Sequence, residues 1–67
     1  MKYQLFINGG EVLRIENSNF YVLKEDYMIQ TTKKQFKEEL KKYKNVCLNT
    51  WCEDIKKQYL TIVNYLK

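Results

Sequence analysis

The chain has 67 residues, of which 45% are hydrophobic and 15% aromatic, and its formal net charge is +4. This length indicates a single domain over residues 1–67, and the hydrophobic content excludes an intrinsically disordered chain. The sequence has neither a run of about 18 apolar residues nor a signal-peptide pattern, so we expect a cytoplasmic protein without a membrane-spanning helix.

The first part of the chain has the pattern of paired β-strands. Residues 2–8, KYQLFIN, alternate between two faces, which is the signature of a strand with one buried side. Asn8 and Gly9 follow, the pair that suits a two-residue hairpin turn because both positions require positive φ. The sequence therefore predicts a hairpin at the N-terminus.

Residues 11–16, EVLRIE, are the predicted returning strand. Alternation places Leu13 and Ile15 on one face, and Val12 and Arg14 on the other. Two further short strands are predicted between turn-forming residues: 20–24 and 27–30. Residues 1–30 are thus expected to form an antiparallel β-meander of three or four strands.

After the meander the hydrophobic spacing becomes helical. Thr32 and Gln35 have the spacing of a capping box, in which the threonine side chain accepts a hydrogen bond from a free amide of the first turn. The predicted helix spans 33–44, and Asn45 is expected to end it because asparagine tolerates the left-handed conformation. One face of this helix is apolar: Phe36, Leu40 and Tyr43.

A second capping box, Thr50 with Glu53, predicts the start of the C-terminal helix. Its apolar side chains form a stripe about 120° wide. The members of this stripe are Trp51, Cys52, Ile55, Tyr59, Ile62, Val63 and Leu66. The fold class that we predict is therefore α+β, with the meander followed by two α-helices in residues 31–67.

The C-terminal stripe has two interpretations. It can lie on the sheet as part of the core, or part of it can contact a second copy of the chain. A domain this small buries only about 60% of its unfolded surface, and the spacing is similar to that of a heptad repeat. We expect a homodimer. The predicted interface for self-association or for another protein partner consists of Ile55, Tyr59, Ile62, Val63 and Leu66.

Lysines gather on one flank of the first predicted helix, in a sector about 100° wide. They are Lys33, Lys34, Lys37, Lys41 and Lys44. A solvated helix face is the simpler interpretation of this pattern. The alternative is nucleic-acid binding through phosphate contacts. Such binding would read sequence weakly, because the only arginine, Arg14, belongs to the predicted sheet.

Aromatic residues of the strands give a second nucleic-acid hypothesis, in which bases stack on an open sheet face. The candidates are Tyr3, Phe6, Phe20 and Tyr21. This hypothesis requires Phe6 and Phe20 to share that open face. The competing interpretation places one aromatic set in the core.

No catalytic or metal-binding pattern is present. Cys47 and Cys52 are the only thiols and the chain has no histidine, so we expect no zinc site. Cys52 is expected to be buried and unreactive because it falls on the apolar stripe beside Trp51. Without histidine the usual general base is also missing. We therefore expect no enzymatic activity, no metal and no cofactor.

The composition also carries a resemblance. Lys, Asn, Ile, Tyr, Phe and Met, whose codons are A/T-rich, supply 33 of the 67 residues, and Ala and Pro are absent. In this respect the whole chain resembles small proteins of low-GC Gram-positive bacteria and their phages and prophages, with no motif behind the resemblance. Together with the absence of catalytic residues and the width of the apolar C-terminal stripe, it indicates a non-enzymatic accessory protein that binds another protein and self-associates. Nucleic-acid binding by the lysine-rich helix is the alternative function.

Overall fold

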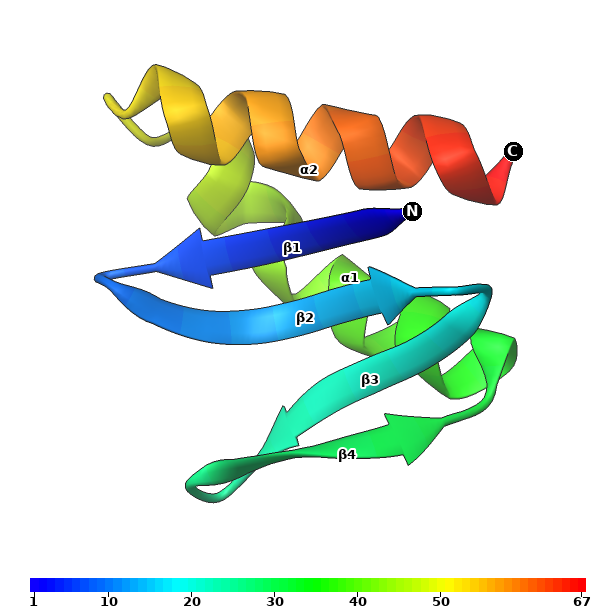
Figure 1. The fold of residues 1–67 in the computed structure, drawn as a ribbon. Coiled ribbons are helices and arrows are strands. Elements are labelled where there is room, and N and C mark those ends of the chain that lie inside the picture. The colour runs from blue at the N-terminus through cyan, green and yellow to red at the C-terminus, as the bar shows by residue number, and fades with distance from the viewer.

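The computed structural model describes residues 1–67 and contains four strands followed by two helices (Figure 1). The elements are β1 (Lys2–Ile7), β2 (Gly10–Glu16), β3 (Asn19–Lys24), β4 (Tyr27–Thr31), α1 (Lys33–Leu48) and α2 (Glu53–Leu66). Each strand pairs antiparallel with the next, and the sheet order is β1-β2-β3-β4. The predicted α+β class is confirmed.

Two-residue turns connect the strands and fix their register. Asn8 and Gly9 have φ angles of 55° and 80°, which confirms the predicted hairpin turn. Asn17 and Ser18 form the second turn, with φ angles of 52° and 68°. In the third turn Glu25 has a φ of 57°, a left-handed conformation that is uncommon for a glutamate. Such short connections leave the strands no room to slide past one another.

A β-bulge interrupts the pairing of β1 with β2. Leu5 lies opposite Leu13 and Phe6 lies opposite Glu11, so Val12 has no partner of its own. As a result Val12 and Leu13 are both buried, although they are neighbours in the chain. The prediction that Val12 shares a face with Arg14 is therefore wrong.

Helix α1 starts where the sequence predicts and ends later. The Thr32 side chain accepts a hydrogen bond from the Gln35 amide at 3.2 Å, which is one half of the predicted capping box. The helix passes Asn45 and continues to Leu48. The reason is packing, because the extra turn brings Cys47 into the core with no exposed surface.

Helix α2 starts two residues later than the second capping box predicts. Its N-cap is Cys52, without a side-chain hydrogen bond, and the Thr50 hydroxyl instead accepts from the Cys52 amide at 3.2 Å. Glu53 and Asp54 occupy the first turn, where negative charge is favourable to the helix dipole. Trp51 and Cys52 therefore lie outside the helix and outside its apolar stripe.

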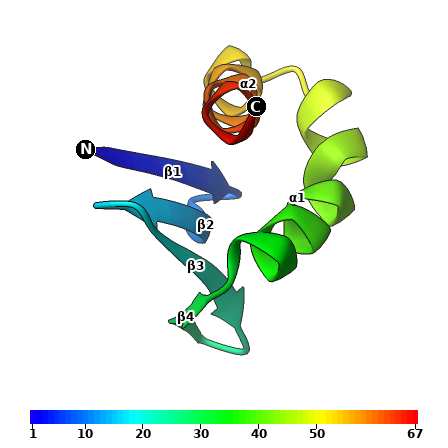
Figure 2. The same cartoon turned by 90° about the vertical axis from the view of Figure 1, so that its right-hand side faces the viewer.

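Both helices cover the same face of the sheet and leave the other face open (Figure 2). Helix α2 packs on β1, and α1 packs on β3. The core between the layers consists of Leu5, Val12, Leu13, Ile15, Val22, Phe36, Leu40, Cys47, Tyr59 and Ile62. The Phe6 amide donates to the Gln58 side chain at 2.9 Å, which ties α2 to the edge of β1. Neither helix has the combination of length and apolarity that crossing a membrane requires.

Candidate functional site

The predicted self-association residues contact the chain's own core. Tyr59 and Ile62 are buried, with 7% and 0% of their surface exposed. Ile55, Val63 and Leu66 are half-buried and pack against the same core. Self-association stays a prediction, but the structure uses this stripe to attach α2 to β1.

The lysine flank, defined as Lys33, Lys34, Lys37, Lys41 and Lys44, lies on α1 and all its members are exposed. None of the five takes part in an ion pair. The neighbouring Lys42 does, since its ammonium lies 3.1 Å from the carboxylate of Glu39. The positive charge of the flank is therefore uncompensated and faces solvent.

Exposed apolar side chains lie where α1 ends: Val46 and Leu48 in its last turn and Trp51 in the following loop. We call Leu48 and Trp51 the Trp51 corner. Trp51 is 99% exposed, and Val46 and Leu48 are each exposed by more than 40%. At about 100° per residue Leu48 falls between Lys37 and Lys41, on the side of the lysine flank, whereas Val46 lies on the opposite side of the helix.

The two cysteines have different environments. Cys52 is exposed, and the prediction that it is a buried thiol is wrong because α2 starts after it. Cys47 is the buried one, and burial raises the pKa of its thiol. Burial likewise raises the pKa of the Tyr59 phenol, so both groups are neutral at pH 7.

The aromatic residues proposed as stacking platforms do not share a face. Phe20 packs on Phe36 and Tyr3 packs on Tyr65, each with ring centroids 5.3 Å apart, so both belong to the helix-covered side. Tyr21 lies on the open face, where the guanidinium of Arg14 sits 5.4 Å from its ring centre. The set that base stacking requires is thus divided between the two faces.

Charged and polar groups connect β1 and β2 on the open face. The Arg14 guanidinium donates to the Glu11 carboxylate from two nitrogens, at 2.9 and 2.5 Å, and lies 3.6 Å from Glu16. The Gln4 amide donates to the same Glu11 carboxylate at 2.6 Å. The hydrogen bond from Arg14 holds the pKa of Glu11 below its ordinary value, against the opposing effect of burial.

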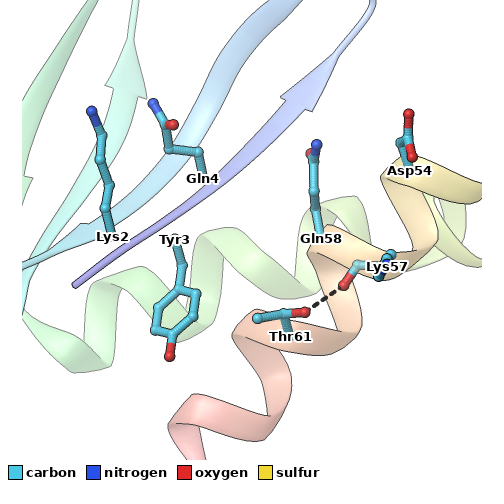
Figure 3. A pocket seen from close by; sticks show the side chains of 7 residues that line it. All are labelled: Lys2, Tyr3, Gln4, Asp54, Lys57, Gln58 and Thr61. Carbon is cyan, nitrogen blue, oxygen red and sulfur yellow. Dashed lines mark hydrogen bonds between the residues drawn. The ribbon is translucent and has the colours of Figure 1, made fainter.

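One open hollow of about 310 Å³ lies between β1 and α2 (Figure 3). Tyr3 is the only hydrophobic residue among the seven that line it, which are Lys2, Tyr3, Gln4, Asp54, Lys57, Gln58 and Thr61. Figure 3 shows Lys2, Gln4 and Gln58 pointing to the same side, beside one another rather than toward a common point.

No three His, Cys, Asp or Glu side chains lie close enough together to hold a metal ion. Compared with models of protein families, with curated proteins and with solved structures, the chain matches none of them. The candidate site is therefore identified from the features of the surface only. The lysine flank with the Trp51 corner combines charge with exposed apolar area.

Sequence reasoning found the lysine flank and missed the Trp51 corner. The capping-box pattern at Thr50 placed Trp51 inside the helix and on its buried stripe. The acidic pair Glu53 and Asp54 is the signal that marks the true first turn, because acidic residues are enriched there. With the helix starting at Glu53, Trp51 falls in a loop.

Proposed function

We propose that this chain is a non-enzymatic protein-binding domain whose binding surface is the Trp51 corner together with the lysine flank. The partner that fits this surface is a protein with an acidic face and an apolar pocket. The observation that carries the proposal is Trp51, which has 99% of its surface exposed and contributes nothing to the core.

An exposed tryptophan has an energetic cost that a binding role explains. Its ring is large and apolar, and aromatic rings that enter a partner's pocket supply much of the affinity of protein interfaces. Trp51 stands in a short loop anchored on both sides by helices. Its backbone is held in place before binding, so less conformational entropy is lost on association.

The lysine flank complements this anchor. Five uncompensated positive charges attract an acidic surface and accelerate encounter, although each exposed ion pair adds little affinity. The A/T-rich composition supports an accessory product of a phage or prophage as the origin of such a domain.

The test is capture from a nuclease-treated lysate of a low-GC Gram-positive bacterium, followed by titration of the purified partner. The Trp51→Ala variant is expected to weaken binding at least about tenfold, as hot-spot aromatics do. Leu60→Ala is the control, because Leu60 is a 50% exposed apolar side chain on α2, outside both the Trp51 corner and β4. A captured partner that binds the Trp51→Ala variant with wild-type affinity would contradict the proposal.

The second candidate is nucleic-acid binding by the lysine flank. Its support is the line of five unpaired lysines, which extends about 16 Å along α1 at the helical rise. Because phosphate contacts release counterions, binding to mixed-sequence DNA is expected to weaken by orders of magnitude between about 50 and about 200 mM salt.

Fluorescence anisotropy of labelled DNA separates the two candidates. The triple variant Lys33/Lys37/Lys41→Glu reverses part of the flank, and Lys2/Lys24/Lys67→Glu changes the net charge equally elsewhere. Phosphate binding by the flank requires the first variant to lose binding and the second to retain much of it. Equal losses of DNA binding by the two variants would indicate an effect of net charge only. If the wild-type chain does not bind DNA even at low salt, the nucleic-acid candidate is wrong and only the protein-binding proposal remains.

A further inference from the structure

The two edges of the sheet are protected differently. At the β1 edge, α2 lies alongside the strand, and Gln58 accepts the hydrogen bond of the Phe6 amide at 2.9 Å. At the β4 edge no element lies beyond the strand (Figure 1). The β4 sequence YMIQT contains no charge, proline or glycine, the usual devices that prevent edge-to-edge pairing.

The backbone groups that β4 presents follow from its hairpin. Lys24 and Tyr27 flank the two-residue turn as a pair, so the backbone of Tyr27 faces β3. Alternation then directs Ile29 and Thr31 toward β3 as well. The N–H and C=O groups of Met28 and Gln30 are directed outward, where no hydrogen-bond partner exists within the chain.

We propose that β4 is the dimerisation strand and that a second copy of this chain pairs with it antiparallel, forming a continuous eight-stranded sheet. The two-fold register places Met28 opposite Gln30 of the partner subunit, and Gln30 opposite Met28 of the partner subunit. Both outward residues of each strand then exchange N–H and C=O groups. Moving the register by two residues leaves one outward residue of each strand without a partner in the other β4.

The side chains of β4 suit this register. Ile29 lies opposite Ile29 of the partner subunit in a close, non-hydrogen-bonded pair on the helix-covered face. Both isoleucines are half-buried within their own chains, so pairing covers the rest of them. β4 has no charged residue, so pairing of two copies places no like charges opposite each other.

This surface is separate from the Trp51 corner, so the inference does not depend on the proposed function. It also differs from the interface that the C-terminal stripe predicts, since that stripe is occupied by the core. A five-residue edge is small beside the about 800 Å² per partner that stable interfaces bury. We therefore expect a weak dimer that forms at high micromolar concentration.

Sedimentation equilibrium over a wide concentration range tests the oligomeric state. The apparent mass is expected to rise from 8.2 kDa toward twice that value as concentration increases. Gln30→Pro removes the outward N–H and is expected to leave a folded monomer, because proline is tolerated on an edge facing solvent. Gln30→Ala keeps the N–H and is expected to dimerise. A wild-type chain that stays monomeric up to millimolar concentration overturns the proposal.

A disulfide test covers the case in which the proline variant fails to fold. In a Cys52→Ser background, Ile29→Cys is expected to form a cross-linked dimer on mild oxidation. The Cα atoms of a non-hydrogen-bonded antiparallel pair lie about 4.5 Å apart, within the range that disulfides span. Thr31→Cys is the control, because in this register it lies opposite Tyr27 of the partner subunit. Equal cross-linking of both variants, or cross-linking of the control alone, overturns the register.

Discussion

Arg14 is the only side chain that contacts two carboxylates and an aromatic ring, which are those of Glu11, Glu16 and Tyr21. Its pair with Glu11 is partly shielded, since the two side chains are 26% and 15% exposed. A hydrogen bond to a charged group in such a position contributes more than a surface ion pair does. Interactions between charged groups therefore stabilise the open face of the sheet in addition to strand pairing.

The pH dependence of this pair follows from the lowered pKa of Glu11. Its stabilisation is complete above the ordinary glutamate pKa of 4.5 and is lost as the pH falls through the lower value in the folded state. Glu11→Gln is expected to lower the free energy of unfolding by about 1–2 kcal/mol at neutral pH. The difference from the wild type should shrink in acid.

Urea denaturation at neutral pH and at a pH well below 4.5 measures this difference. Glu25→Gln is the matched control, because Glu25 is exposed in a turn and makes no ion pair. An equal loss for Glu11→Gln at both pH values would mean that packing, not charge, is the contribution of this side chain.

At the scale of elements, the two threonines before the helices have different roles. Thr32 caps α1 through the Gln35 amide, whereas Thr50 bonds within the loop and leaves α2 without a side-chain cap. Thr32→Ala is expected to lower the free energy of unfolding by about 1 kcal/mol, the usual value of an N-cap. Thr50→Ala should cost less. Thermal unfolding followed by circular dichroism compares them, and a larger loss at Thr50 would contradict this assignment.

The elements also show what the sequence could predict. Strands and turns were predictable because alternation and turn chemistry are local, as at Asn8 and Gly9. The bulge at Val12 was not, because it depends on how two strands pair. The exposure of the lysine flank followed from helical periodicity. The exposure of Trp51 did not, because it depends on where α2 begins, and helix boundaries are decided by packing as much as by local pattern.

At the scale of the whole molecule, a two-layer arrangement of this size has one core and no second one. All ten buried residues form a single cluster to which the sheet and both helices contribute. Helix α2 is joined to β1 although the two lie at opposite ends of the sequence. Leu5 on β1 has no exposed surface, and loss of α2 is expected to expose it, so we expect the helix and the sheet to unfold together.

Two truncations to alanine on α2, one at a buried residue and one at an exposed residue, test this cooperativity. Ile62 has no exposed surface, and Ile62→Ala is expected to lower the free energy of unfolding by about 2–5 kcal/mol. A small domain has a free energy of unfolding of only about 5–15 kcal/mol, so the variant should melt far below the wild type.

Leu60 is 50% exposed on the same helix, and Leu60→Ala is expected to have a small effect. Far-ultraviolet circular dichroism reports the backbone, and near-ultraviolet circular dichroism reports the packing of the aromatic side chains, which include Tyr3 on Tyr65 between β1 and α2 and Phe20 on Phe36 between β3 and α1. The two signals should be lost together in the Ile62→Ala variant, because a two-state unit unfolds as a whole. If the two signals are lost at different temperatures, the helices and the sheet do not unfold as one unit and the single-core description is wrong.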